Sequence, residues 1–229
     1  DVLVANGRHW GGPNWAYFNN GKGAFSQMIP FGTGKDRSYA ARAIDYNGDG
    51  LVDIAVANDR QQSRVYLRNL RGNYAPGPAI GPVSQNTRNL FVSDMDGDKR
   101  PDILVANRRE ANFIYYNSAK GDIMEGNVLG SGEDSTICIA IADLNGDGKP
   151  DVVLANRDGQ PNAIYLNAGA KNFGKAIVYG TGSDNTRSVA LGDMNGDGHL
   201  DIIAANVGQP NRVFFNNGKA LFAESTAFG

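Results

Sequence analysis

The chain has 229 residues, of which 41% are hydrophobic and 20% charged, and its formal net charge is −2. This length is enough for a full hydrophobic core and lies within the range of one all-β domain. No apolar run approaches the ~20 residues of a membrane helix, so we expect no membrane span, and we expect no nucleic-acid partner. The 30 glycines fall in short, evenly spaced clusters, which indicates many turns and therefore many short strands.

From residue 45 onward, one acidic motif recurs four times. It reads Asp-x-(Asn or Asp)-Gly-Asp-(Gly or Lys)-x-x-Asp and spans residues 45–53, 94–102, 143–151 and 193–201. Its first aspartate recurs at steps of 49, 49 and 50 residues, and each copy leads into an apolar run that ends in Ala-Asn. The opening residues 1–6 are a fifth copy of that run, beginning at the motif's last aspartate. A fixed period of this length indicates a repeat architecture.

Each period holds four short β-rich runs separated by turns, without helical periodicity. Four strands per repeat is the pattern of a propeller blade, whereas a parallel β-helix needs a shorter period and a helical solenoid needs apolar spacing of 3.6. We therefore predict an all-β fold, a β-propeller of four-stranded antiparallel blades with about five blades in this chain. It forms a single domain over residues 1–229, with approximate repeats at 1–34, 35–83, 84–132, 133–182 and 183–229.

The number of blades in the complete ring stays open. The chain holds five copies of the second, third and fourth runs but only four of the first, because it starts at the end of an acidic motif. Either the ring has five blades with a short first blade, or the chain is a piece of a longer protein with about seven blades. The start midway through a motif favours the longer protein.

The acidic motif has the donor pattern of a calcium loop. Oxygen-bearing side chains stand at positions 1, 3, 5 and 9, and position 7 offers a backbone carbonyl, as a cation that takes six to eight oxygen ligands requires. Glycines at positions 4 and 6 suit a backbone with positive φ; Lys99 replaces the second glycine in one copy and should strain that loop. The alternative is that these segments are plain hairpin turns, but a turn does not need the ninth carboxylate.

Charge supports the metal interpretation. The four motifs contain 13 of the 24 acidic residues, and these carboxylates repel one another at close range without a cation. Four bound Ca²⁺ ions would move the formal charge from −2 to +6. We therefore expect neutral or anionic partners.

The acidic motif, the Ala-Asn run, the Pro-Asn-x-hydrophobic-Tyr run and the Phe-Gly pairs at residues 31–32 and 228–229 together resemble the FG-GAP/VCBS repeat family, which includes the integrin α-subunit propeller and propeller lectins. The resemblance covers the whole chain and implies calcium in the hairpin between the first two strands of a blade. It implies these side-chain ligands, in four sites: Asp45, Asn47, Asp49, Asp53; Asp94, Asp96, Asp98, Asp102; Asp143, Asn145, Asp147, Asp151; Asp193, Asn195, Asp197, Asp201. Position 7, with its backbone carbonyl, falls on Leu51, Arg100, Lys149 and His199.

Members of this family are mostly extracellular and serve in adhesion, carbohydrate binding or as scaffolds, and a minority are polysaccharide lyases. We accordingly expect a secreted, periplasmic or cell-surface protein in which calcium is structural and which binds a protein or glycan as an adhesion or scaffold module. The alternative is a lectin with pockets between blades or over the central channel. An enzyme is not expected, because the chain has two histidines and no nucleophile motif outside the acidic loops.

Four residues are candidates for ligand contact. Both tryptophans of the chain, Trp10 and Trp15, fall in one short segment, and an exposed Trp suits a sugar face or a protein contact. Arg88 and Arg187 lie in the polar segments that lead into the innermost strands. In a propeller these segments surround one mouth of the channel, where they would meet a sugar or an anion, unless they only cap strand ends.

Overall fold

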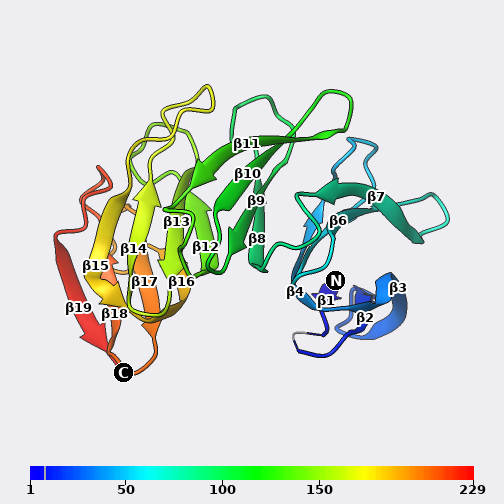
Figure 1. Cartoon of the computed structure of the whole chain (residues 1–229), viewed down its shortest axis with the longest axis horizontal. Coiled ribbons are helices and arrows are strands. Elements are labelled where there is room, and N and C mark those ends of the chain that lie inside the picture. Colours follow the sequence, from blue (N-terminus) through cyan, green and yellow to red (C-terminus); the bar gives the residue numbers. More distant parts are fainter. Residues whose placement is uncertain (8) are drawn as a thin grey trace.

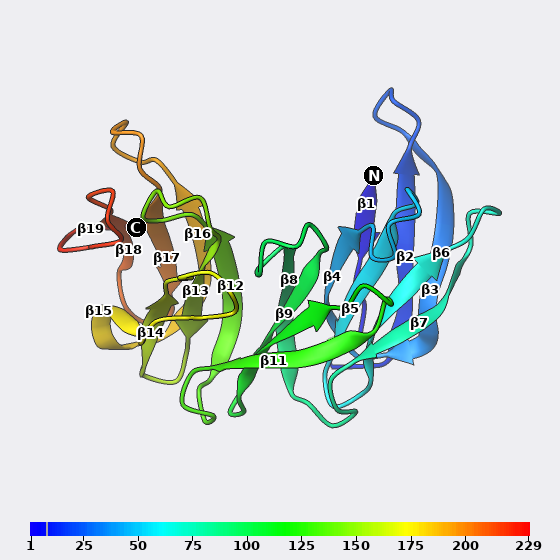
Figure 2. The ribbon, with the colours of Figure 1, turned by 90° about the horizontal axis from the view of Figure 1, so that it is seen from above.

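The computed structural model describes residues 1–7 and 9–229, and within that range every regular element is a β-strand (Figure 1). Consecutive strands form five antiparallel sheets, four of them four-stranded and the first three-stranded. The sheets follow one another around an open arc, with the first and the last at opposite ends of its long axis (Figure 2). This arrangement confirms the predicted all-β propeller with about five blades. The described residues contain no helix long and apolar enough to cross a membrane.

The strands of each blade succeed one another in chain order. The first two blades consist of β1 (Val2–Val4), β2 (Gly12–Asn19) and β3 (Phe25–Asp36), then β4 (Ser38–Ile44), β5 (Asp53–Asn58), β6 (Ser63–Arg68) and β7 (Tyr74–Ile80). The third blade consists of β8 (Thr87–Ser93), β9 (Asp102–Asn107), β10 (Asn112–Asn117) and β11 (Ile123–Leu129). The last two consist of β12 (Thr136–Ala142), β13 (Asp151–Asn156), β14 (Gln160–Tyr165) and β15 (Ile177–Asp184), then β16 (Thr186–Gly192), β17 (Asp201–Asn206), β18 (Asn211–Phe215) and β19 (Glu224–Phe228).

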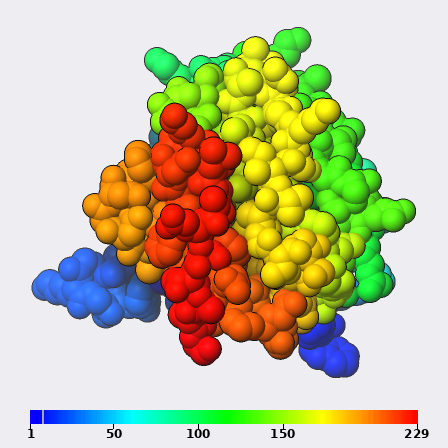
Figure 3. Space-filling model, turned by 90° about the vertical axis from the view of Figure 1, so that its left-hand side faces the viewer, coloured from blue at the N-terminus to red at the C-terminus, as the bar shows by residue number. Residues whose placement is uncertain are grey.

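The first and last strands of a blade lie at its two sides. Strands β4, β8, β12 and β16 face the inside of the arc, and β11 runs along its outside (Figure 2). In the last blade, β19 is exposed along its whole length and lies uncovered at the surface (Figure 3). In the first blade, β1 pairs with β2 as β5 pairs with β6, so the expected copy of the innermost strand is the one that this sheet lacks.

The hydrophobic cores lie between neighbouring blades. The second strand of a blade is buried on both faces, so its side chains alternate between two interfaces. In β5, Ile54 and Val56 pack toward the first blade, whereas Ala55 and Ala57 pack toward the third. Each of the four blade junctions thus has its own apolar cluster. Burial of apolar area favours the contact but does not fix its geometry, since the hydrophobic effect is non-directional.

A chain of buried hydrogen bonds between polar side chains, called the relay below, fixes the relative orientation of neighbouring blades. Asn162 of β14 donates its side-chain amide to the hydroxyl of Thr186 in the next blade (2.8 Å), and Thr186 donates to Asn206 Oδ1 (2.8 Å). Asn206 in turn donates its backbone N–H to Asn211 Oδ1 (2.9 Å), so the next relay residue is held as well. Equivalent relays link the third blade to the fourth and the first to the second. The repeated Asn and Ser/Thr side chains therefore connect neighbouring blades through buried hydrogen bonds.

The relay is broken at one junction. In the second blade Ser63 replaces the relay asparagine and accepts only the N–H of Asn58 (3.0 Å). The hydroxyl of Thr87 and the side-chain oxygen of Asn107, which occupy the relay positions of the third blade, are buried without a hydrogen-bond partner. Serine has a short side chain without an amide, so it cannot donate to the neighbouring blade as asparagine does. The unsatisfied buried polar atoms destabilise the fold.

We predict that Ser63→Asn stabilises the protein by about 1 kcal/mol, because the new amide can donate to Thr87 as Asn112 and Asn162 donate to their partners. Chemical denaturation measures the change. Ser63→Ala is the control and should destabilise it, since the N–H of Asn58 loses its acceptor. An Asn variant no more stable than the parent would contradict the role given to the relay.

Candidate metal loops and channel mouth

Each acidic motif forms the hairpin between the first and second strands of a blade. Residues 45–53 connect β4 to β5, and the other three motifs connect β8 to β9, β12 to β13 and β16 to β17. Because all four connections run in the same direction along the ring, the loops lie on one face of the propeller. The predicted ligand residues are thereby gathered into four separate groups.

Side-chain oxygens inside each loop hold its backbone in a coil. In the third loop, Asp143 accepts the N–H groups of Gly146 (2.7 Å) and Gly148 (2.8 Å) with its two oxygens. Asn145 Oδ1 accepts the N–H of Asp147 (3.1 Å), and Asp147 Oδ1 accepts that of Lys149 (2.9 Å). The other loops repeat this pattern. Oxygens at positions 1, 3 and 5 are thus turned toward the interior of the coil, which is the arrangement that a hard cation can use.

The ninth aspartate of each motif is completely buried. In the second loop, Asp102 accepts the N–H of Met95 (2.8 Å) with one oxygen and that of Asn117 (2.9 Å) with the other. Desolvation by burial raises the pKa of Asp102 to about 6, although the two backbone hydrogen bonds oppose the rise. Burial also raises the pKa of Asp53 and Asp151. A buried carboxylate that is costly to ionise is a natural partner for a cation.

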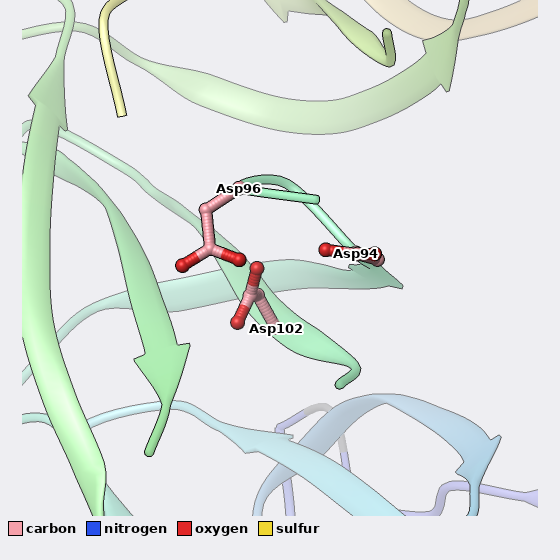
Figure 4. Close-up of side chains that lie close together, drawn as sticks. All are labelled: Asp94, Asp96 and Asp102. Carbon is pink, nitrogen blue, oxygen red and sulfur yellow. The ribbon is translucent and has the colours of Figure 1, made fainter. Parts of the chain in front are cut away.

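Three carboxylates converge in the second loop. Ligand atoms of Asp94, Asp96 and Asp102 lie within 4.8 Å of one another and surround a common space (Figure 4). Lys171 of the fourth blade lies 3.2 Å from Asp96, and Arg100 pairs with Asp98. The donor set fits calcium, because every group is an oxygen and several carry charge. The nearby cations partly neutralise the carboxylates and would compete with a metal.

The third-strand asparagines fasten the loops to the neighbouring blade. The amide of Asn117 donates to the backbone carbonyl of Tyr46 in the first loop (2.8 Å), and Asn167 donates to Met95 in the second (2.9 Å). The backbone N–H groups of the same asparagines bind the ninth aspartate of their own blade. A loop that holds a metal would therefore also brace a junction between blades.

Positive φ angles confirm the expected role of the loop glycines. Gly48 and Gly50 have φ angles of 72° and 82°, and the glycines of the other loops are similar. Lys99 stands at the second of these positions with φ of 68°. A non-glycine residue pays a steric penalty in this left-handed region, so the second loop carries the strain that its sequence predicts.

We predict that Lys99→Gly stabilises the second loop by about 0.5–1 kcal/mol, because glycine adopts positive φ without the penalty. Thermal unfolding under chelating conditions isolates this backbone effect from metal binding. Gly148→Ala in the third loop is the matched control and should destabilise by a similar amount, since a Cβ there meets no atom within 4 Å and only the φ of 81° resists it. Equal stability of both variants and the parent would contradict the strain.

The buried carboxylate of Asp102 gives a second prediction, for the metal-free protein. The folded-state pKa of about 6 lies above the ordinary value of 3.8, so the folded state retains a proton that the unfolded state loses. The contribution of Asp102 therefore favours folding at low pH and is lost as the pH rises from about 4 to above 6. The expected loss is up to about 3 kcal/mol. Urea denaturation in chelator at several pH values measures it, and Asp102→Asn should flatten the dependence; an unchanged slope in the variant would contradict the assignment.

The other face carries the mouth of the channel, at the opposite ends of the strands. A strand such as β13 begins at the loop aspartate and ends five residues later at Asn156, so the two faces are about 17 Å apart. A cavity of about 720 Å³ opens there. Its charged lining is strongly basic and comprises His9, Arg60, Arg88, Arg108, Arg157 and Arg187 with Asp59.

The cavity includes two of the four predicted contact residues. Arg88 and Arg187 lie in its wall, as the sequence predicts. Arg60, Arg108 and Arg157 were not predicted, although they share a signal: each stands one or two residues after an Ala-Asn at the end of a second strand. Reading that position across the repeats would have found them.

Ion pairs occupy part of this basic lining. Arg88 lies 2.8 Å from Asp59 and stacks over the ring of Tyr39. Asp158, beside the cavity, binds Arg108 (3.0 Å) and Arg157 (2.8 Å). Partial burial raises the pKa of Asp158, but the hydrogen bonds from Arg108 and Ser135 and the nearby guanidinium charges outweigh it and hold the pKa at about 2. Both carboxylates therefore act as internal counter-ions.

The aspartates of the polar segments around the mouth accept hydrogen bonds within their own turns. Asp36 accepts the N–H and hydroxyl of Thr33, and Asp184 binds Thr181 in the same way. These aspartates are committed to the fold rather than free for a ligand.

The tryptophans are separated by the structure. Trp10 is 85% exposed and follows the cavity residue His9 in the chain, whereas Trp15 is half-buried within β2. Arg8, in the same segment, lies outside the described residues. Only Trp10 is therefore placed to offer a whole ring face to a ligand.

The fold and its acidic loops define a β-propeller built from repeats with a metal-loop sequence. A family model described as FG-GAP-like repeat matches residues 1–56, 45–105, 94–154 and 143–204. The chain belongs to this family. No curated protein matches it.

Several solved structures share the fold at low sequence identity. A lectin of Agrocybe aegerita, studied for its recognition of non-reducing terminal N-acetylglucosamine, is 20% identical with a TM-score of 0.62; the match covers 98% of this chain and 65% of the lectin. The V. cholerae biofilm matrix protein Bap1 is 18% identical with a TM-score of 0.56, over 93% of this chain and 33% of Bap1. BBS1N, in its complex with ARL6DN, is 14% identical with a TM-score of 0.54, over 90% and 60%. The chain thus spans less than two thirds of each neighbour, and these matches show the fold.

Proposed function

We propose that this chain is an extracellular, calcium-stabilised binding module whose calcium ions are structural and which does not itself catalyse a reaction. The observation that carries the calcium proposal is the repetition of one oxygen-donor coil in four loops, each ending in a buried carboxylate. A calcium ion bound there would supply charge neutralisation and a rigid cross-link between the two strands of the hairpin. The residues that would hold it are those at motif positions 1, 3, 5 and 9.

A role in adhesion or as a scaffold is supported by the architecture. Propellers present rigid loops at both faces, and the polar relays fix the blades relative to one another. The biofilm matrix protein among the structural neighbours supports a role of this kind.

Glycan binding is the second candidate function. It is favoured by a lectin among the structural neighbours, by the open cavity at the channel mouth and by the exposed ring of Trp10. A glycan array probed with and without chelator separates this candidate from a protein-binding role: broad silence in calcium favours protein binding.

We predict that removal of calcium with chelator markedly lowers the melting temperature, because a ligand that binds only the folded state stabilises it. Re-addition of calcium, but not of a monovalent salt, should restore it. Thermal unfolding monitored by circular dichroism measures both. An unchanged melting temperature after thorough chelation would refute the calcium proposal.

A matched pair of variants tests the loops themselves. Asp147→Ala removes a carboxylate at position 5, whereas Asn145→Ala removes a neutral oxygen at position 3 of the same loop. We expect the Asp147 variant to lose more of the calcium-dependent stabilisation, since charge dominates the attraction for a divalent ion. Equal effects of the two substitutions would mean that the loop acts only as a turn.

A further inference from the structure

The mouth of the channel carries more positive charge than its own carboxylates neutralise. Five arginines line the cavity, with one lining carboxylate, Asp59, and a second, Asp158, beside it. These seven residues carry a net formal charge of +3 on a chain whose total is −2. Arg60 and Arg187 have no carboxylate partner among residues 1–7 and 9–229. A concave site lined by one sign of charge concentrates ions of the opposite sign.

Two of these guanidinium groups also retain unused hydrogen-bond donors. The Nε atoms of Arg187 and Arg108 are buried and have no hydrogen-bond partner. A buried donor without an acceptor is unfavourable, and the planar guanidinium group is shaped to donate two parallel hydrogen bonds to an oxyanion. An oxyanion in the cavity would balance the charge of these guanidinium groups.

The size and openness of the site can accommodate a segment of a sugar chain. Its volume of about 720 Å³ falls within the ordinary range for ligand pockets, and it opens to solvent. Trp10, which follows the lining residue His9, adds an exposed ring on which the apolar face of a sugar can pack. The calcium loops lie on the opposite face, so no loop metal can bridge this ligand to the protein.

We propose that the arginine mouth binds an acidic polysaccharide through its carboxylate or sulfate groups, with Arg60 and Arg187 making the decisive contacts. This inference rests on the proposed function as a binding module and adds the class of ligand and the place where it binds. Arg88, Arg108 and Arg157 shape the wall and raise the local potential, while their own carboxylate partners hold them in position.

The test compares two charge-matched double variants of the calcium-loaded chain. Arg60→Gln with Arg187→Gln removes the two arginines without a carboxylate partner, whereas Arg71→Gln with Lys120→Gln removes two exposed cations from hairpins on the loop face. Each is titrated with polygalacturonate, dextran sulfate, neutral dextran and poly-glutamate. The first two probes distinguish carboxylate from sulfate as the recognised group.

The expected result is binding of at least one acidic polysaccharide, none of neutral dextran, and an affinity at least about tenfold lower in the mouth variant but not in the control. Equal losses in both variants would overturn the proposal, because they would indicate general charge attraction. Binding of a neutral glycan unaffected by the mouth variant would overturn it while leaving the binding-module function intact. Binding of poly-glutamate without either acidic polysaccharide would overturn it in favour of an acidic peptide, and absence of all binding would overturn it whether or not calcium stabilises the fold.

Discussion

The buried relay of asparagine and hydroxyl side chains is the directional interaction that sets the blade arrangement at three of the four junctions of this propeller. Apolar contact stabilises any close packing of two blades and allows many relative orientations. The hydrogen bonds from Asn162 to Thr186 and from Thr186 to Asn206 can form in only one relative orientation of the blades. Because unpaired polar groups in a core are costly, a rotated blade would lose more than it gains. The relay includes Asn156, which directly precedes Arg157, and Thr186, which directly precedes Arg187, so it also fixes the backbone from which these two mouth arginines extend.

The two faces of the molecule are fastened by different chemistry. At the mouth the fasteners are neutral amides and hydroxyls, which do not titrate and need no cofactor. On the opposite face the fasteners are buried carboxylates such as Asp102 and Asp151, whose ionisation is opposed by desolvation. Stability should therefore respond to divalent ions through the loop face, whereas pH acts on both faces, because the lowered pKa of Asp158 belongs to the mouth. The apolar clusters between blades are the same with and without bound metal.

Much of this could be predicted from sequence, because repetition multiplies weak local signals. The four acidic motifs located the hairpins, their glycines have the expected positive φ, and the strand runs predicted the blades. The polar relay was missed because its side-chain links join residues 20 or 24 positions apart, such as Asn112 and Thr136, which looked like separate strand boundaries. The arginine mouth was only half predicted for the same reason: Arg60, Arg108 and Arg157 lie in different repeats, and only the curvature of the ring brings them to one cavity.

The chain is nearly neutral overall, but its acidic and basic groups are separated in space. This separation decides how calcium bound at the loops can affect ligand binding at the mouth. Acidic groups collect in the loops and arginines at the mouth, about 17 Å away along a strand. At physiological ionic strength the Debye length is about 8 Å, so loading the loops changes the potential at the mouth only weakly through solvent. Calcium can then influence a ligand at the mouth chiefly by stabilising the folded ring that positions the arginines. A calcium requirement that disappears in a more stable variant would be the signature of that indirect route, and one that persists would contradict it.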